Sequence, residues 1–253
     1  MPDGTELPES RPIILVYGHS HTHAVHRAIT ERLGKQRPVP LTVFRSLNRS
    51  NTKNVGNITF EAFLERASQL GPEDILVSMI GGNHHAIAST LQHPQPSDFF
   101  TPDAEAPANA GPEIIPYRAI MQGFGKAVLK KEGKQLLRLQ QATRARIAHL
   151  LPPPPKFDNA YVARHAGKVL APGGIAPSEV SPPELRLKFW NLQSRVLHKW
   201  CGDRGIEVLP PPPEALEQGF LRREYWNPDA THANELYGEL VLRLVEKRFL
   251  TES

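Results

Sequence analysis

The chain has 253 residues, of which 40% are hydrophobic and 22% charged, with 30 Lys and Arg against 26 Asp and Glu. This balance excludes a disordered or fibrous protein and is typical of a globular domain. A single cysteine, Cys201, excludes a disulfide framework and a cysteine-rich zinc site.

The ends of the chain and its charges bear on location and partners. The N-terminal stretch "MPDGTELPES" is acidic and polar, unlike the basic and then apolar start of a secretory signal. No apolar run approaches the roughly 20 residues that span a bilayer. We therefore expect a cytoplasmic protein without a membrane span. The modest basic cluster at 126–146 is interpreted as a solvated helix face, with nucleic-acid binding as the less favoured alternative.

The first third of the chain alternates apolar runs with helical patterns. Continuous apolar runs of this length are typical of buried parallel strands. Thr59 is in position to cap the second helix, and Gly34 and Gly71 mark helix ends. In chain order, the predicted elements are a strand at 12–18, a helix at 23–34, a strand at 39–44, a helix at 59–71 and a strand at 74–82.

The segment from about 92 to 180 interrupts this alternation. It holds a polar, Pro-rich stretch at 92–116, a helix expected over about 117–150, and the run "PPPP" at 152–155. Stretches this long with little regular structure are usually functional or mobile. We interpret the segment as an inserted lid over one end of the sheet.

The last third returns to the earlier rhythm. We predict a helix at 181–205 with Ser181 as its N-cap, a strand at 206–210 and a final helix at 231–249. Strand–helix alternation of this kind favours a doubly wound domain. The sequence therefore predicts a single α/β domain over 1–253, a three-layer α/β/α sandwich with a mostly parallel, flavodoxin-like sheet.

Three polar blocks follow or adjoin these elements. They are "GHSHT" at 18–22, "GGNHH" at 81–85 and "DATH" at 229–232. Ligands of open α/β sheets bind at the carboxyl ends of the strands, so the blocks are expected to meet at one rim. A serine becomes nucleophilic when a base takes its proton and an acceptor orients that base, which Ser20, His232 and Asp229 could provide. The amide of Asn83 is the kind of donor that stabilises an oxyanion.

The order of these blocks resembles the SGNH, or GDSL, hydrolase superfamily, above all in the closing stretch "NPDATHANELYG" at 227–238. The resemblance implies a catalytic triad of Ser20 as nucleophile, His232 as general base and acid, and Asp229 as orienting carboxylate. It also implies an oxyanion hole formed by the Ser20 amide, Asn83 and a glycine amide from the loop at 46–57, where Gly56 is the only glycine. It requires no cofactor and no metal.

Two residues depart from that pattern. His19 stands where the family usually has Asp before the serine, and His84 stands where it often has Asp after the asparagine. Neither position belongs to the triad. His19, His21 and His84 are therefore expected to line the site.

The resemblance implies an esterase that cleaves a carboxylic ester of a small molecule or carbohydrate through an acyl-enzyme on Ser20. Three alternatives stay open: an O-acyltransferase with the same triad, a metal-dependent phosphoesterase, and a non-catalytic binding relative. "GHSH" and "GNHH" resemble motifs of calcineurin-like metallophosphoesterases, but there the Gly-His-x-His block comes last. Neither the acyl length, the alcohol partner nor the oligomeric state follows from these motifs.

Overall fold

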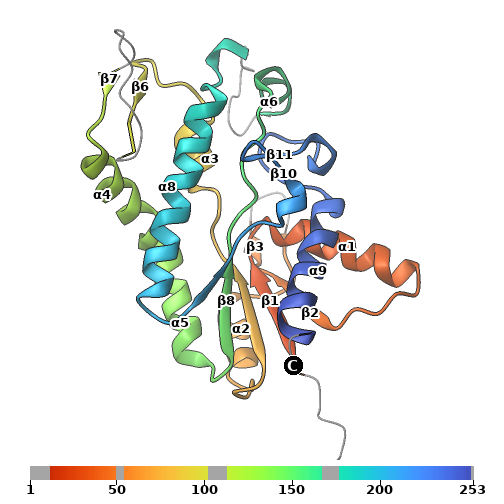
Figure 1. The fold of residues 1–253 in the computed structure, drawn as a ribbon. Coiled ribbons are helices and arrows are strands. Elements are labelled where there is room, and N and C mark those ends of the chain that lie inside the picture. The colour runs from red at the N-terminus through yellow and green to blue at the C-terminus, as the bar shows by residue number, and fades with distance from the viewer. Residues whose placement is uncertain (1–11, 50–53, 102–112, 167–176, 252–253) are drawn as a thin grey trace, which may run out of the picture.

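The computed structural model describes residues 12–49, 54–101, 113–166 and 177–251. Five parallel strands form the central sheet in the order β2-β1-β5-β8-β9 (Figure 1). The strands are β1 (Ile14–Gly18), β2 (Leu41–Arg45), β5 (Ile75–Met79), β8 (Arg146–Leu150) and β9 (Glu207–Leu209). Counted within this sheet, the order is 2-1-3-4-5, the flavodoxin-like arrangement. The predicted fold class is confirmed.

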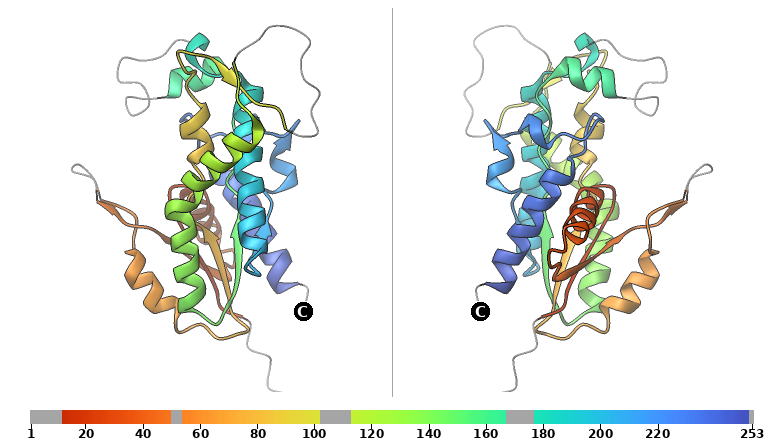
Figure 2. Two further views of the ribbon diagram at one scale, coloured as in Figure 1. Left: turned by 90° about the vertical axis from the view of Figure 1, so that its left-hand side faces the viewer. Right: turned by 90° about the vertical axis from the view of Figure 1, so that its right-hand side faces the viewer.

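Helices cover both faces of the sheet (Figures 1 and 2). Strand β1 alternates: Ile14 and Val16 pack with α1 and α9, whereas Leu15 and Tyr17 pack with α2, α5 and the buried Cys201 of α8. This gives two hydrophobic layers around one buried sheet. The helices are α1 (Thr22–Gly34), α2 (Phe60–Ala67), α3 (His84–Ser89), α4 (Tyr117–Val128), α5 (Lys134–Ala142), α6 (Asn159–His165), α8 (Pro183–Gly202) and α9 (Glu235–Leu250).

Several shorter elements lie outside the central sheet and its covering helices. A π-helical turn, η1 (Leu129–Gly133), joins α4 to α5. Three short 3₁₀ turns are η2 (Pro177–Glu179), η3 (Pro213–Ala215) and η4 (Arg223–Tyr225). Two-residue strands form three small ladders: β3 (Asn48–Arg49) with β4 (Asn54–Val55), β6 (Ser97–Asp98) with β7 (Glu113–Ile114), and β10 (Leu216–Glu217) with β11 (Phe220–Leu221).

The predicted helix over 117–150 is wrong in its last residues. The helical stretch ends at Ala142, Thr143 is extended, and residues 146–150 form β8 between β5 and β9. Arg146 and His149 interrupt the apolar run, but His149 is buried in the sheet, with Nδ1 3.3 Å from Ser78 Oγ. This part of the predicted lid therefore belongs to the central sheet.

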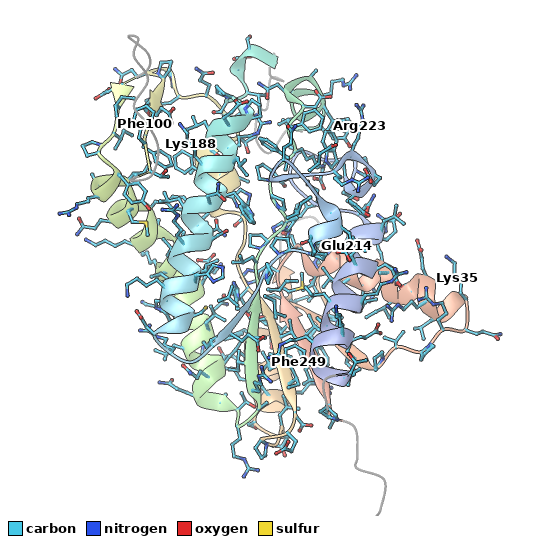
Figure 3. All side chains as sticks on the ribbon, viewed as in Figure 1. Lys35, Phe100, Lys188, Glu214, Arg223 and Phe249 are labelled. Atoms are coloured by element: carbon cyan, nitrogen blue, oxygen red, sulfur yellow. The ribbon has the colours of Figure 1, made fainter. Side chains whose placement is uncertain are left out.

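The rest of the segment at 92–180 is only partly described. Residues 102–112 and 167–176 of the predicted lid lie outside the described residues. The described part near β6 is attached to α8: Lys188 Nζ lies 2.6 Å from Asp98 Oδ2 and over the ring of Phe100 (Figure 3).

The two predicted helix caps had different outcomes. Thr59 accepts a hydrogen bond from the Ala62 N–H at 3.2 Å and caps α2 as expected. The prediction that Ser181 caps α8 is wrong, because Pro182 occupies the cap position and no side chain caps the helix. Ser181 is instead buried, and its carbonyl accepts a hydrogen bond from Arg186.

Within the described residues, no helix is both long and apolar enough to cross a membrane.

Candidate active site

The site lies where the direction of strand crossover reverses. Strand β2 lies on one side of β1 and β5 on the other, so the connections after β1 and β5 leave the sheet in opposite senses. Ligands of doubly wound sheets bind outside the carboxyl ends of such a pair. Ser20 follows β1 and Asn83 follows β5, so both lie at this point.

A tight turn carries Ser20 from β1 into α1. The N–H of His19 donates to the Met79 carbonyl at 3.2 Å and so anchors the turn to β5. The N–H groups of Thr22 and His23 donate back to the His19 and Ser20 carbonyls at 3.2 and 3.1 Å. The serine is thus held just before the first turn of the helix, half-buried at the rim.

The turn before α9 places Asp229 and His232 side by side. Asp229 Oδ2 lies 3.0 Å from Nδ1 of the His232 ring and accepts a hydrogen bond from Asn227 Nδ2 at 2.6 Å. Asp229 Oδ1 accepts the backbone N–H groups of Thr231 and His232 at 2.8 and 2.6 Å. Because Asp229 uses Nδ1, the other ring nitrogen, Nε2, is left for a reacting group.

Hydrogen bonds keep Asp229 ionised. Burial on its own raises the pKa of this carboxyl, but the hydrogen bonds and charge of His232, with the Asn227 amide, outweigh it. The pKa of Asp229 therefore lies well below its ordinary range. An ionised acceptor of this kind holds an imidazole in one tautomer and orientation.

Lys156 supports this turn, and the sequence analysis did not find it. Its side chain is 2% exposed, and Nζ donates to the carbonyls of Asn227 and Asp229 at 2.7 and 2.5 Å. Nζ also lies 3.7 Å from Asp229 Oδ1 and faces the rings of Tyr161 and Trp226. Burial lowers the pKa of Lys156 to about 8, although Asp229 opposes the shift. Its only sequence signal is a lysine directly after "PPPP".

Close packing of α1 against α9 brings the two turns together. A Cβ on Gly238 of α9 would lie 2.1 Å from the carbonyl oxygen of Ala24 in α1, so only glycine allows the helices to approach this closely. The ring of His21, beside Ser20, lies 5.1 Å from that of His232, centroid to centroid. The glycine at the end of "NPDATHANELYG" therefore has a packing role.

The loop after β5 needs its two glycines. Gly81 and Gly82 have φ angles of 75° and 98°, a region that favours glycine. Added Cβ atoms would lie 2.3 Å from Glu132 Cγ and 2.9 Å from His21 Cδ2. The Gly81 N–H donates to Nδ1 of His19 at 2.9 Å. His19 thus joins the loop that carries Asn83 to the turn that carries Ser20.

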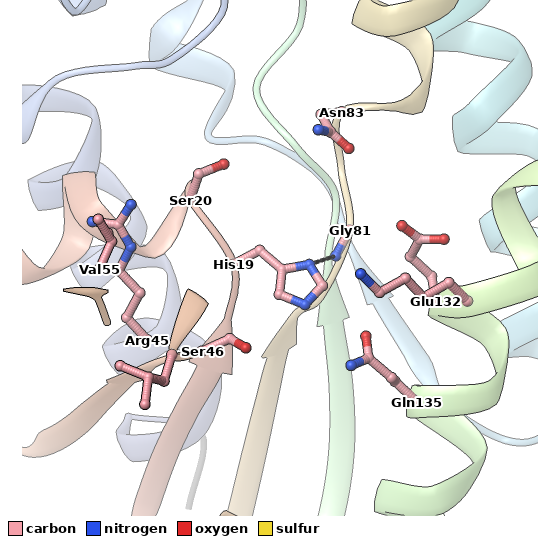
Figure 4. Close-up of a pocket in the computed structure, with 11 residues that line it drawn as sticks. His19, Ser20, Arg45, Ser46, Val55, Gly81, Asn83, Glu132 and Gln135 are labelled. Atoms are coloured by element: carbon pink, nitrogen blue, oxygen red, sulfur yellow. Dashed lines mark hydrogen bonds between the residues drawn. The ribbon is translucent and has the colours of Figure 1, made fainter. Parts of the chain in front are cut away.

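Ser20, His19 and Asn83 line one cavity of about 460 Å³ (Figure 4). Ser20 and Asn83 lie on facing sides of it, and their roles as nucleophile and oxyanion donor stay predictions. No hydrogen bond joins the Ser20 hydroxyl to the His232 ring in this structure. Catalytic hydrogen bonds of this kind often form only when substrate is bound.

Gly56 lies in a tight turn of the loop after β2. Gly56 has a φ of 109° and packs against the Ser46 carbonyl, where a Cβ would be 2.3 Å away. The turn thus requires a glycine there, and the role of Gly56 as an oxyanion donor stays a prediction.

His84 begins α3, with Nδ1 3.3 Å from Oε1 of Glu132 in η1. Glu132, 5% exposed, was not predicted, and π-helical turns of this kind are frequent at functional sites.

The histidines of the rim do not gather around one point. His19 accepts from Gly81, His84 faces Glu132, and His21 is 7% exposed with its ring beside that of His232. Burial, followed by the nearby His232 and His85, lowers the pKa of His21 well below its ordinary value. Among the described residues, no group of three or more His, Cys, Asp or Glu is arranged to hold a metal ion.

Comparison with known proteins gives distant structural likeness only. No family model matches the chain, and no curated protein matches it. A protein from Bacteroides fragilis provisionally named an acylhydrolase is 13% identical, with a TM-score of 0.46, over 98% of this chain and 92% of its own. A GDSL-like lipase from Bacteroides thetaiotaomicron is 10% identical, with a TM-score of 0.47, over 96% of this chain and 93% of its own. The SGNH-like fold expected from the motifs agrees with the observed sheet order, and likeness at this level gives no information on substrate.

Proposed function

We propose that the protein hydrolyses a carboxylic ester through an acyl-enzyme on Ser20. The observation that carries the proposal is the Asp229–His232 pair, at 3.0 Å, on a turn packed beside the Ser20 turn at the carboxyl end of the sheet. An ionised carboxylate that orients an imidazole next to a serine is the arrangement that makes a hydroxyl nucleophilic.

In the first half of the reaction, His232 Nε2 takes the proton of the Ser20 hydroxyl as Oγ bonds to the ester carbonyl carbon. The negative charge moves to the carbonyl oxygen, to which we expect Asn83 Nδ2 and the Ser20 N–H to donate. One such donor contributes about 3–4 kcal/mol of barrier reduction in a hydrolase. The C–O bond to the alcohol then breaks, and His232 returns its proton to the departing oxygen.

In the second half, water replaces the alcohol. His232 takes a proton from water as the water oxygen bonds to the acyl carbon. The bond to Ser20 Oγ then breaks, the serine regains its proton, and the carboxylic acid leaves. Asp229 stays ionised throughout and balances the positive imidazole ring.

Hydrolysis of p-nitrophenyl esters of increasing chain length tests the proposal. We expect Ser20→Ala and His232→Ala each to lower kcat at least about a thousandfold, as the loss of a triad member does in serine hydrolases. Thr30→Ala, on the exposed part of α1, is the matched control and is expected to keep wild-type activity. Wild-type activity in Ser20→Ala would overturn the proposal.

A further inference from the structure

The cavity beside Ser20 contains an arginine without a carboxylate partner. Arg45 ends β2 and is half-buried in the cavity wall, and burial lowers the pKa of its guanidinium. Among the described residues, no Asp or Glu lies within ion-pair distance of it, and no group accepts a hydrogen bond from its side chain. A partly desolvated charge without a partner is costly, so such a charge suggests a ligand.

Arg32 and Arg186, which are buried more fully than Arg45, contact other groups of the chain, although Nε of Arg186 has no hydrogen-bond partner among the described residues. Arg32 contacts the carboxylates of Glu239 and Glu246, and Arg186 donates to backbone carbonyls and to Asn159. Arg45 differs from both because its side chain faces the cavity (Figure 4). The unpaired charge is therefore a property of this cavity.

One carboxylate, that of Glu132, also lines the cavity, and its buried Oε2 has no hydrogen-bond partner among the described residues. Glu132 lies on the wall opposite Arg45 (Figure 4) and faces His84 at 3.3 Å. Lys131, next to it in the lining, forms no ion pair with a described residue. The cavity thus presents Arg45 and Lys131, which have no carboxylate partner in the part of the chain that the structure describes, to whatever enters beside Ser20.

Further cations lie in a hollow beside the cavity. A neighbouring hollow shares Lys131 and Gln135 with it and is also lined by Lys130, Lys134 and Arg138. Arg138 pairs with Glu61, at 2.6 Å, but no described carboxylate pairs with Lys130 or Lys134. Positive charges gathered in and beside a cavity attract anionic ligands to it.

The position of His232 indicates which half of the ester enters the cavity. His232 must lie beside the alcohol oxygen to protonate it, and it is not among the residues that line the cavity. The alcohol therefore departs on the His232 side, and the acyl group is left for the cavity. We propose, on the basis of the function proposed above, that the cavity binds an anionic group on the acyl part of the substrate, held by Arg45 and Lys131.

A pair of p-nitrophenyl esters that differ only in the terminal charge tests this proposal. One is the hexanoate, and the other is the monoester of adipic acid, which has the same chain length and ends in a carboxylate. We expect kcat/KM to be about tenfold higher for the adipate ester, the factor that corresponds to roughly 1.4 kcal/mol. The preference is expected to fall to about one in Arg45→Gln and to decrease in Lys131→Gln, a surface substitution with little effect on folding.

Lys126→Gln is the matched control, since Lys126 is exposed on α4 outside the cavity lining, and its preference should equal that of the wild type. A third ester, which ends in a phosphonate, tests whether the cavity also binds a phosphoryl group. A higher kcat/KM for either anionic ester than for the hexanoate supports the proposal. No preference for either anion, or an unchanged preference in Arg45→Gln, would overturn it while hexanoate hydrolysis still upheld the proposed function. Absence of all hydrolysis would overturn both.

Discussion

The imidazole of His19 accepts a hydrogen bond from the backbone N–H of Gly81, with 2.9 Å between Nδ1 and the amide nitrogen. Burial, with the charge of Lys131, lowers the pKa of His19, so the ring is neutral at pH 7 and its proton lies on Nε2. The resemblance to SGNH hydrolases predicts Asp at this position, and a carboxylate can also accept an N–H. A histidine at this position is therefore compatible with a working site.

Substitutions at His19 should follow their ability to accept that hydrogen bond. His19→Asn and His19→Asp keep an acceptor, whereas His19→Leu leaves the Gly81 N–H without a partner. We expect His19→Leu to lose about 1–3 kcal/mol in the free energy of unfolding and to lower kcat/KM. Urea unfolding and ester kinetics measure both quantities. Equal stability and activity in all three variants would show that the contact does not position the loop.

Buried histidines should make the protein unstable in acid. Burial lowers the pKa of both His85 and His149 to about 4, from 6.5 for an exposed ring. Between these values the unfolded chain binds protons that the folded chain does not, so stability falls as pH decreases below about 6.5. Each ring should cost about 2 kcal/mol of unfolding free energy between pH 7 and pH 5. Urea unfolding at the two pH values tests this, and His149→Gln should show a smaller loss than the wild type.

Lys156→Met should impair catalysis through the turn that carries Asp229. The substitution keeps an unbranched side chain but removes the donor to the Asn227 and Asp229 carbonyls and the charge 3.7 Å from Asp229. We expect kcat to fall at least about tenfold, with a smaller change in KM.

The matched control for Lys156 is Lys199→Met, since Lys199 is exposed on α8 and pairs with Asp203, far in the sequence from the turn that carries Asp229. Its kinetics should equal those of the wild type. A Lys156→Met protein with wild-type kcat and KM and only a lower free energy of unfolding would assign the lysine a purely structural role.

Gly238→Ala should separate α1 from α9. The added Cβ would lie 2.1 Å from the Ala24 carbonyl oxygen, and overpacking of this kind costs about 1–3 kcal/mol. We expect a lower midpoint of urea unfolding and weaker ester hydrolysis, because the two turns of the site are carried by these helices. Gly123→Ala on α4, where nothing lies within 4 Å of the new Cβ, should instead leave stability unchanged or raise it. Equal stability in the two variants would contradict the packing argument.

Site residues that directly follow a recognisable strand could be predicted from the sequence. Residues that reach the site only through tertiary packing could not. Ser20 and Asn83 each follow a mainly apolar strand without charged residues, so their place at the rim followed from sequence order. Strand β8 was missed because Arg146 and His149 interrupt its apolar pattern directly after a long amphipathic helix. Lys156 and Glu132 are ordinary charged residues in sequence, and only the fold buries them beside Asp229 and Gly81.

The most direct test of the central claim is covalent labelling by a fluorophosphonate, followed by mass spectrometry of the proteolytic peptides. The account predicts a single phosphonyl adduct on Ser20, absent in Ser20→Ala and much slower to form in His232→Ala and Asp229→Asn. Labelling that persists in Ser20→Ala, or maps to another residue, would contradict it.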